Sequence, residues 1–587
     1  MKSGMNFKHL CLLSILLTSA CISAETQSIS NIYIINTTPS SVYFYNVNRK
    51  MADAFVLIDK NPTNAVLEPQ GRLLYILHDG IPRANQSPKE LKLPKKTSSL
   101  SVIDVKSKQF LKKIQLGWYA ANIVFANDST LIIYGVGKPR RGDPKSDAEM
   151  GYITVINART GNIIFSTARW RWIQGIAWTS DFSRIIVLGA DQLKIGNYGI
   201  RPYNPKISIF DAKGNLLNEI FTPTRIKPHS EFFNMRFAFS KDQNWFYVYD
   251  QGGHFKDKMK SNNAVVMVVD LKTCELIKSH DLGSQTGLII RNPYNGNVAI
   301  LVNSPQKNEQ YQVFRLNGSD IYSQGINFPV YYIASSNKPE GFFVFNNQKS
   351  IFLPDTIDST FQTIGTMVPT YNDPLSGNII NSISLPKKGK IVLITSYFEF
   401  GIYNTMNQNL ECTGDIGREG IRTLEITGML LSDLTQLGII PFFYEMRNYK
   451  PLLKNTQIRK DEEFIYLLEL RSKDITIINT EDGSVVDKIP VGDDCRGITL
   501  TPDSRYLFAL NNNRLKVIDT RTNKEYNKYI FGEDKGTIKD ISFIDESGNL
   551  ALLFEYTLQI WNIEEGKSIT ECKLGSKAEF LVCSVIQ

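Results

Sequence analysis

The stretch GITLTPDSRYLFALNNNRLKVIDTRTNKEYNKYIFG, from Gly497 to Gly532, contains the pattern that decides the fold. An alternating apolar segment reaches a turn at Pro502-Asp503-Ser504, and two further apolar segments follow, at Tyr506 to Leu510 and at Leu515 to Asp519. A turn at Thr522-Asn523 leads into a fourth segment and a closing glycine. Short alternating runs separated by Pro, Asp, Ser and Asn are typical of strands joined by tight turns. The stretch therefore predicts one unit of four short antiparallel strands.

The third strand of this unit recurs along the whole chain. Each copy is an apolar run that ends in Asp or Asn, namely at Asp104, Asn157, Asp211, Asp270, Asn479, Asp519 and Asn562. Successive copies are 53, 54 and 59 residues apart early in the chain and 40 and 43 residues apart near its end. Four strands in roughly 40–45 residues is the period of a propeller blade. We therefore predict an all-β chain of about ten or eleven four-stranded blades.

Two units resemble known repeats. The unit from Gly497 to Gly532 resembles the YVTN-type bacterial β-propeller repeat in its Thr501-Pro502-Asp503 turn and its Val517-Ile518-Asp519 third strand. The last unit, with Ile560-Trp561-Asn562, is similar to the WD40 repeat. The resemblance implies a β-propeller and indicates almost nothing about function, because such propellers host many unrelated activities.

Ten or eleven blades exceed the four to eight of an ordinary ring. We therefore expect two propellers in tandem, with about seven blades in residues 30–366 and four to six in residues 367–587. Residues 31–60 supply strands without a leading partner, and the chain ends in a lone strand, AEFLVCSVIQ. This C-terminal strand could complete an N-terminal blade and so remove two open sheet edges.

Residues 1–24 are typical of an export signal. Lys2 and Lys8 give a positive start, Leu10 to Ala20 is a short apolar core, and Ala24 closes a small-residue cleavage site. We expect an exported protein that is periplasmic, at the cell surface or secreted. The alternative is a lipoprotein anchored through Cys21, although the leucine that such a site prefers three residues earlier is replaced by Thr18. Membrane association is expected only in that case.

Five cysteines remain after removal of residues 1–24: Cys274, Cys412, Cys495, Cys572 and Cys583. They are too sparse for a disulfide scaffold. Buried thiols are the favoured interpretation. One or two bridges remain open, with Cys572 and Cys583 the nearest pair.

The surplus of positive charge is concentrated in four predicted loops, each connecting a second and a third strand: 78–99, 136–150, 190–206 and 250–263. We call these the basic segments. Their 15 cations against eight acids give +7, whereas the chain without residues 1–24 has a net charge of only +6. Blade geometry brings such connections to one face of a ring, so this face is predicted to bind an anionic partner. The predicted binding residues are Arg83, Lys89, Lys92, Lys95, Lys96, Lys138, Arg140, Arg141, Lys145, Lys194, Arg201, Lys206, Lys256, Lys258 and Lys260.

The connections between blades in the second half are acidic. They predict a rim at the mouth of a central channel, able to hold a cation. Turn residues that simply face water are the alternative interpretation. The rim residues are Asp415, Glu419, Asp493, Asp494, Glu533 and Asp534.

Catalytic motifs are scarce. The four histidines after residue 24 form no HExxH, HxH or CxxCH motif, and no GxSxG or strand-bound GxGxxG is present. In quinone-dependent dehydrogenase propellers, the docking motif resembles the pattern AxDxxTGxxxW. Here Thr160-Gly161 matches once, and Phe165 stands near the expected tryptophan. We assign no catalytic residue, metal or cofactor.

These patterns favour an exported, non-catalytic β-propeller that binds a protein, an acidic glycan or a lipid head group through its basic segments. Nucleic acid is not expected as a partner. The alternative is a propeller enzyme, either a quinone-dependent oxidoreductase or a hydrolase or lyase. Its site would lie at the channel mouth, with Asp493, Asp494 and Glu533 holding a cation or acting on a proton.

Overall fold

A computed structural model of the chain describes most of residues 29–585, and its regular structure there consists of β-strands. The residues outside the described part are 1–28, 79–97, 117–119, 121, 136–150, 197–198, 222–234, 251–263, 283–286, 293–295, 303–310, 327–329, 331, 338, 347, 355–374, 376–378, 396–398, 417–452, 470–473, 493–494, 513, 527–535, 545–548, 576 and 586–587. In the described part, no helix is long and apolar enough to span a bilayer.

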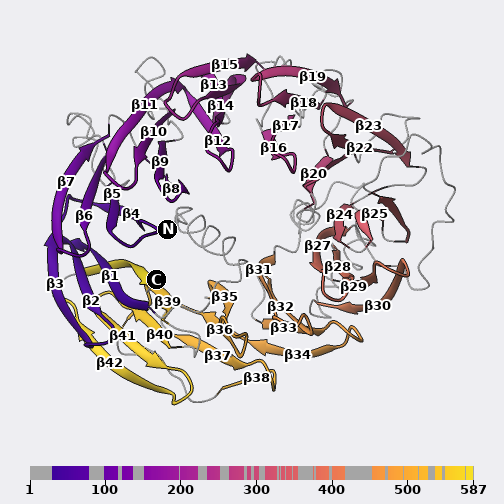
Figure 1. Cartoon of the computed structure of the whole chain (residues 1–587). Helices are drawn as coiled ribbons and strands as arrows, with labels where there is room; N and C mark the ends of the chain where they lie inside the picture. Colours follow the sequence, from indigo (N-terminus) through magenta and orange to yellow (C-terminus); the bar gives the residue numbers. More distant parts are fainter. Residues whose placement is uncertain are drawn as a thin grey trace, which may run out of the picture.

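The described strands form eleven sheets that follow one another around a ring (Figure 1). Ten of these sheets have four strands and one has three. Within each sheet, neighbouring strands pair antiparallel, with one end strand near the centre of the ring and the other at its outer rim (Figure 1). The predicted all-β propeller is therefore confirmed, and the eleven sheets agree with the predicted ten or eleven blades.

Ten sheets are each formed by one continuous stretch of chain. In the first five of them, the strands follow the sequence order from the centre of the ring to its outer rim. Their strands are β4 (Pro62–Leu67), β5 (Leu73–His78), β6 (Ser99–Asp104) and β7 (Gln109–Gln115); β8 (Asn122–Asn127), β9 (Thr130–Gly135), β10 (Gly151–Asn157) and β11 (Asn162–Trp170); β12 (Trp172–Trp178), β13 (Ile185–Gly196), β14 (Gly199–Phe210) and β15 (Leu216–Phe221); β16 (Met235–Phe239), β17 (Trp245–Asp250), β18 (Val265–Asp270) and β19 (Glu275–Asp281); and β20 (Gly287–Arg291), β21 (Val298–Val302), β22 (Tyr311–Asn317) and β23 (Asp320–Ile326).

The next five sheets keep the same order. Their strands are β24 (Tyr332–Asn337), β25 (Glu340–Phe345) and β26 (Ser350–Pro354); β27 (Ile379–Leu385), β28 (Lys390–Thr395), β29 (Glu399–Asn404) and β30 (Asn409–Asp415); β31 (Leu453–Ile458), β32 (Phe464–Glu469), β33 (Asp474–Asn479) and β34 (Val485–Pro490); β35 (Gly497–Leu500), β36 (Tyr506–Leu510), β37 (Leu515–Asp519) and β38 (Lys524–Glu525); and β39 (Asp540–Phe543), β40 (Leu550–Leu553), β41 (Thr557–Asn562) and β42 (Lys567–Lys573).

The eleventh sheet, here called the closing sheet, joins the two ends of the described chain. Its order is β3 (Met51–Leu57), β2 (Ser40–Asn46), β1 (Ile29–Thr38) and β43 (Lys577–Val585). The lone C-terminal strand pairs antiparallel with β1, setting Ile32 opposite Cys583 and Ile34 opposite Leu581. The ring is thus held shut by backbone hydrogen bonds between segments more than 500 residues apart in sequence.

Hydrophobic clusters lie between the sheets. Each described sheet shares one cluster with the sheet before it and one with the sheet after it, and the closing sheet packs against both of its neighbours. One such cluster joins Phe343 and Phe345 to Ile391 and Leu393, on either side of residue 366. The described sheets form one ring rather than the two that were expected, because shared clusters continue on both sides of residues 355–374. The predicted boundary itself, at residues 366–367, lies outside the described part.

The residues that close the third strands explain the repeat. At all seven positions, the side-chain oxygen of the Asp or Asn accepts hydrogen bonds from backbone N–H groups two to four residues later. These side chains therefore build the turn into the fourth strand, which is a role that only a short polar side chain can fill.

The first turn of the repeat has an equally local cause. The hydroxyls of Thr179, Ser240 and Thr501 donate to a carboxylate two residues later, at 2.5–2.6 Å. In each turn, that carboxylate also accepts a backbone N–H from the residue two positions further on. These contacts account for the recurring Thr/Ser-x-Asp sequence between first and second strands.

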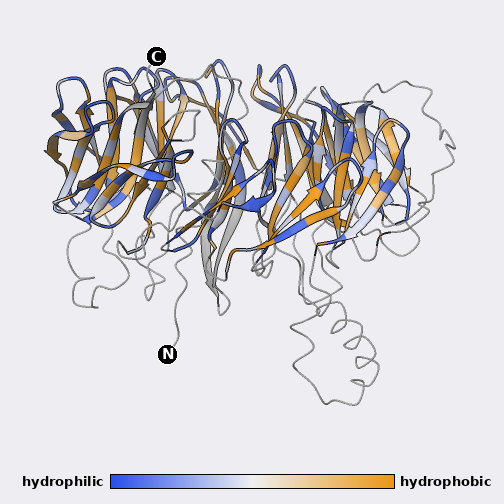
Figure 2. Cartoon of the chain, turned by 90° about the horizontal axis from the view of Figure 1, so that it is seen from below, coloured by the Kyte–Doolittle hydropathy of each residue, from blue (hydrophilic) through white to orange (hydrophobic). Residues whose placement is uncertain are grey.

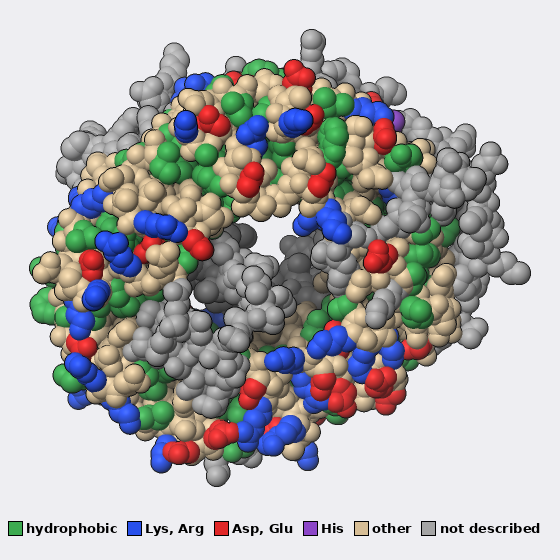
Figure 3. Space-filling model, in the orientation of Figure 1, with side chains coloured by type: hydrophobic (Ala, Val, Ile, Leu, Met, Phe, Trp, Pro, Cys, Tyr) green, Lys and Arg blue, Asp and Glu red, His purple; other side chains and the backbone are tan. Residues whose placement is uncertain are grey.

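The antiparallel order gives the ring two faces. Turns between first and second strands and between third and fourth strands lie on one face, here called the turn face. Connections between second and third strands and between successive sheets lie on the other, here called the connection face. Figure 2 shows the sheets standing side by side, with their strands running between these two faces. Figure 3 shows an opening at the centre of the ring.

Candidate functional site

The connection face is the candidate site, because all four basic segments depart from it. They join β5 to β6, β9 to β10, β13 to β14 and β17 to β18, which are in each case the two middle strands of a sheet. Twelve predicted binding residues lie outside the described part, and their role stays a prediction: Arg83, Lys89, Lys92, Lys95, Lys96, Lys138, Arg140, Arg141, Lys145, Lys256, Lys258 and Lys260.

The third basic segment is a hairpin rather than the loop that the sequence predicts. β13 and β14 stay paired from Ile185 opposite Phe210 to Gly196 opposite Gly199, whereas β12 accompanies β13 only as far as Ala190. The five pairs from Gln192 onward therefore form a two-stranded ribbon beyond the sheet, about 17 Å long at 3.3–3.4 Å per residue. The register sets Lys194 directly opposite Arg201 on this ribbon.

Lys206 lies at the base of the ribbon and is buried. Its Nζ lies 2.6 Å from Oδ1 of Asp191 and 3.0 Å from Oε1 of Glu219. Glu219 also accepts a hydrogen bond from Ser208, whose hydroxyl receives the indole N–H of the fully buried Trp170. The Lys206 side chain is therefore held in an ion-pair network at the base of the ribbon. In this position it supports the ribbon and is not available to contact a partner.

A second buried polar cluster lies where the first basic segment leaves its sheet. Nε2 of His78 lies 2.8 Å from the hydroxyl oxygen of Ser101, and both side chains are buried. Beside them, Asp59 accepts a 2.6 Å hydrogen bond from Ser99 and an ion pair from Lys113 at 2.5 Å. These residues come from β5, β6, β7 and the link between β3 and β4, so the cluster connects three strands of the sheet to the segment that enters it.

Burial determines the charge of the histidine in this cluster. Desolvation lowers the pKa of His78 to about 4, although the neighbouring Asp59 carboxylate acts in the opposite direction. Burial alone would raise the pKa of Asp59, but the hydrogen bonds from Lys113 and Ser99 lower it to about 2. At neutral pH the cluster therefore contains a neutral imidazole beside a paired carboxylate. Because Ser101 is fully buried, its hydroxyl has no access to a substrate.

The predicted acidic rim is largely beyond the described part. Asp415 is described and is exposed at the end of β30. Glu419, Asp493, Asp494, Glu533 and Asp534 are outside the described residues, and the rim stays a prediction. Among the residues that are described, no group of three or more His, Cys, Asp or Glu is arranged to hold a metal ion.

The residues that raised the enzyme alternative have structural contacts. Thr160-Gly161 is the turn between β10 and β11, with the backbone N–H of Thr160 bonded to Asn157 and Gly161 at a φ of +66°. Phe165 stacks on Phe210 at 6.3 Å between ring centres, within a cluster that includes Trp170. Cys274, Cys412 and Cys572 are free thiols, so within the described part Cys572 forms no disulfide bridge.

Sequence reasoning missed the Asp59–His78 cluster and the structural role of Lys206. The histidine ends a fully apolar strand, LLYILH, and that position is a signal for burial. The paired glycines Gly196 and Gly199 are a signal for the hairpin that was expected to be a loop.

No family model matches the chain, and no curated protein matches its sequence. Solved structures with a similar arrangement include one described as the eukaryotic initiation factor, with a TM-score of 0.42 and 10% identity, covering 96% of this chain and 98% of that chain. Saccharomyces cerevisiae Sqt1 gives a TM-score of 0.36 at 9% identity, covering 69% and 96%. The C-terminal WD40 domain of Sif2 gives 0.34 at 8% identity, covering 78% and 94%. At these values the likeness carries no argument about function.

Proposed function

We propose that the chain is an exported, non-catalytic β-propeller of the YVTN-like kind, which binds an anionic macromolecule through its basic segments. The observation that carries this proposal is the concentration of charge. Four segments supply a net +7, slightly more than the whole chain after residue 24. The antiparallel order of the sheets makes all four leave from the connection face.

The described part of the third basic segment supports the same assignment. Its backbone register sets Lys194 directly opposite Arg201, on a ribbon that continues beyond the sheet. Two of the predicted binding residues therefore occupy the same register position of this ribbon. Lys206, neutralised by two carboxylates, is not part of the proposed contact.

The proposal is tested by reversing charge on the connection face. The variant carries Lys95→Glu, Lys96→Glu, Arg140→Glu and Arg141→Glu. Its matched control makes the same change of net charge on the turn face, by replacing four exposed residues between third and fourth strands with Glu: Lys106, Arg159, Lys213 and Lys272. Binding is measured to three probes, namely a sulfated glycan, vesicles rich in phosphatidylglycerol, and polyglutamate, from 50 to 300 mM salt.

We expect the connection-face variant to bind the preferred probe at least tenfold more weakly and with a flatter salt dependence, because fewer charges attract the anion. The turn-face control should keep both the affinity and the salt dependence. The ranking of the probes identifies the class of partner. Equal effects of the two variants would show that net charge, not the connection face, governs binding.

A further inference from the structure

The outermost strand of the closing sheet, β3, is an unusually apolar edge. Among the described residues, no strand pairs with its outer side. The side chains of Met51, Phe55 and Leu57 are 53%, 61% and 63% exposed. Among the described strands, β3 therefore has the largest number of exposed large apolar side chains. Edge strands of soluble proteins are usually protected by charges, especially lysine, because their free N–H and C=O groups can pair with another strand.

The charges on and beside β3 do not protect this edge. Its one charged residue, Asp53, is paired with Lys108 of the neighbouring sheet at 3.0 Å. Asp59, just beyond the strand, is held by Lys113. The neighbouring cations Arg49, Lys50 and Lys60 are exposed, and within the described residues no ion pair involves them. The edge thus exposes Met51, Phe55 and Leu57, and exposed cations lie before and after it in the sequence.

The register shows which way the apolar side chains point. Phe55 lies opposite Tyr43 and stacks on it, with 5.8 Å between ring centres. Tyr43 packs against the cluster that the closing sheet shares with the β39–β42 sheet. Leu57, two residues from Phe55 and opposite Ser41, is on the same side. Both exposed side chains therefore line the outer part of the gap between these two sheets.

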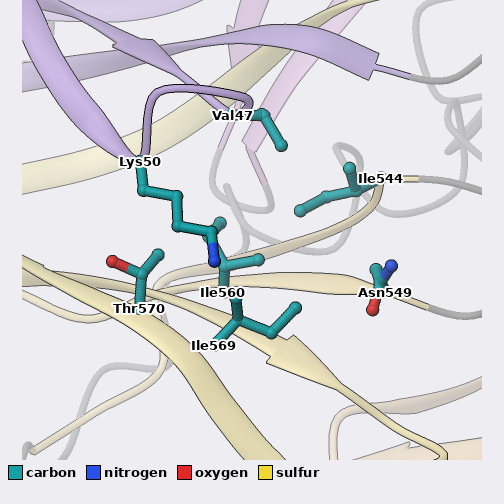
Figure 4. Close-up of a pocket in the computed structure, with 7 residues that line it drawn as sticks. All are labelled: Val47, Lys50, Ile544, Asn549, Ile560, Ile569 and Thr570. Atoms are coloured by element: carbon teal, nitrogen blue, oxygen red, sulfur yellow. The ribbon is translucent and has the colours of Figure 1, made fainter.

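A small pocket lies in the same gap, next to the turn that precedes β3. Val47, Ile544, Ile560 and Ile569 give it apolar walls, and Lys50, Asn549 and Thr570 complete the lining (Figure 4). Its volume is about 90 Å³. This is roughly three times the volume that one water molecule occupies in liquid water, and is enough for one aliphatic side chain. The ammonium group of Lys50 lies beside these apolar walls.

We propose that β3 binds an extended segment of another protein, which adds to the closing sheet as a fifth strand. Backbone hydrogen bonds to the open edge would supply affinity, as in other cases of strand addition. Alternate apolar residues of the segment would cover Phe55 and Leu57, and one aliphatic side chain would enter the pocket beside Lys50. Acidic residues at its ends would meet Arg49, Lys50 and Lys60. This surface is separate from the basic segments and does not depend on the proposed function.

The probe is a fluorescein-labelled peptide of eleven residues. Leucine or valine alternates with threonine over seven positions, the length of β3, and glutamates occupy both ends. A second peptide has the same sequence with alternate backbone amides N-methylated, so that it cannot donate to the edge. Affinity is measured by fluorescence anisotropy with the full chain, and hydrogen exchange reports protection of residues 51–57.

Two variants examine the site. Leu57→Lys places a protecting charge on the edge, and Lys50→Glu reverses the charge at the pocket. The matched control is Leu217→Lys on β15, which is another exposed leucine on an outer strand. We expect Leu57→Lys to weaken binding at least tenfold and Lys50→Glu about three- to tenfold, with Leu217→Lys unchanged and with β3 amides protected by the first peptide only.

Three results would overturn the proposal. Equal binding of the N-methylated peptide would exclude strand addition, and equal affinities of the Leu57→Lys and Leu217→Lys variants would place the peptide elsewhere. Sedimentation showing a dimer of the chain that Leu57→Lys dissociates would make a second copy the occupant of this edge.

Discussion

Acidification should destabilise the fold through one buried histidine. The pKa of His78 is about 4 in the folded chain, against about 6.5 for an exposed histidine. The unfolded chain therefore takes up a proton first as the pH falls. The contribution of His78 to stability is complete above pH 6.5, declines between pH 6.5 and pH 4, and is lost below that range. Linkage gives a loss of about 2 kcal/mol at pH 5 and about 3 kcal/mol when the decline is complete.

The assay is urea unfolding followed by tryptophan fluorescence between pH 7.5 and pH 4.5. The test variant is His78→Gln, which keeps a polar contact for Ser101 and does not titrate. The control is His280→Gln, which removes an exposed histidine from β19. The wild-type chain and the control should lose about 2 kcal/mol more than His78→Gln between pH 7.5 and pH 5. Parallel pH profiles for all three proteins would refute the assignment of a buried neutral imidazole.

Three further outcomes follow from buried contacts. Lys206→Met should cost about 1–3 kcal/mol of unfolding free energy, because it removes the cation from two partly exposed carboxylates, of which Glu219 keeps the hydrogen bond from Ser208. The exposed Lys213→Met should cost almost nothing in the same denaturation assay. Burial raises the pKa of Asp540, whose two carboxylate oxygens accept the backbone N–H groups of Ile541 and Leu581. By calorimetry, the wild-type chain should therefore gain stability relative to Asp540→Asn as the pH falls from 7 toward 4, because the folded chain takes up a proton at Asp540 before the unfolded chain does. Removing residues 577–587 opens the closing sheet at β1, and size-exclusion chromatography should show aggregation, whereas a monomeric, cooperatively folded product would contradict the closure.

The repeat predicted the fold because its signals are local. The Asp and Asn residues that close third strands bond to backbone groups within four residues, and the Thr/Ser-x-Asp turns do the same. Such contacts are visible in a short window of sequence. The apolar alternation before them identifies the strands whose side chains fill the clusters between sheets.

The candidate site depended on contacts that span the chain. Asp59, His78, Ser101 and Lys113 meet only because four segments of one sheet are brought together. Lys206 resembles its neighbours in the basic segments, and only its burial beside Asp191 and Glu219 separates it from them. The open edge of β3 also requires knowledge of strand order, because its sequence, MADAFVL, would suit an inner strand equally well.

Native mass spectrometry of the protein, purified gently from its own host, distinguishes a binding propeller from a propeller enzyme. We expect a polypeptide that begins near residue 25, either alone or carrying another protein or an anionic polymer. Loss of that partner from the Lys95, Lys96, Arg140 and Arg141 charge-reversal variant would place it on the connection face. A retained quinone or a stoichiometric metal ion would contradict the proposed binding function, and would direct attention to an enzyme site at the channel mouth.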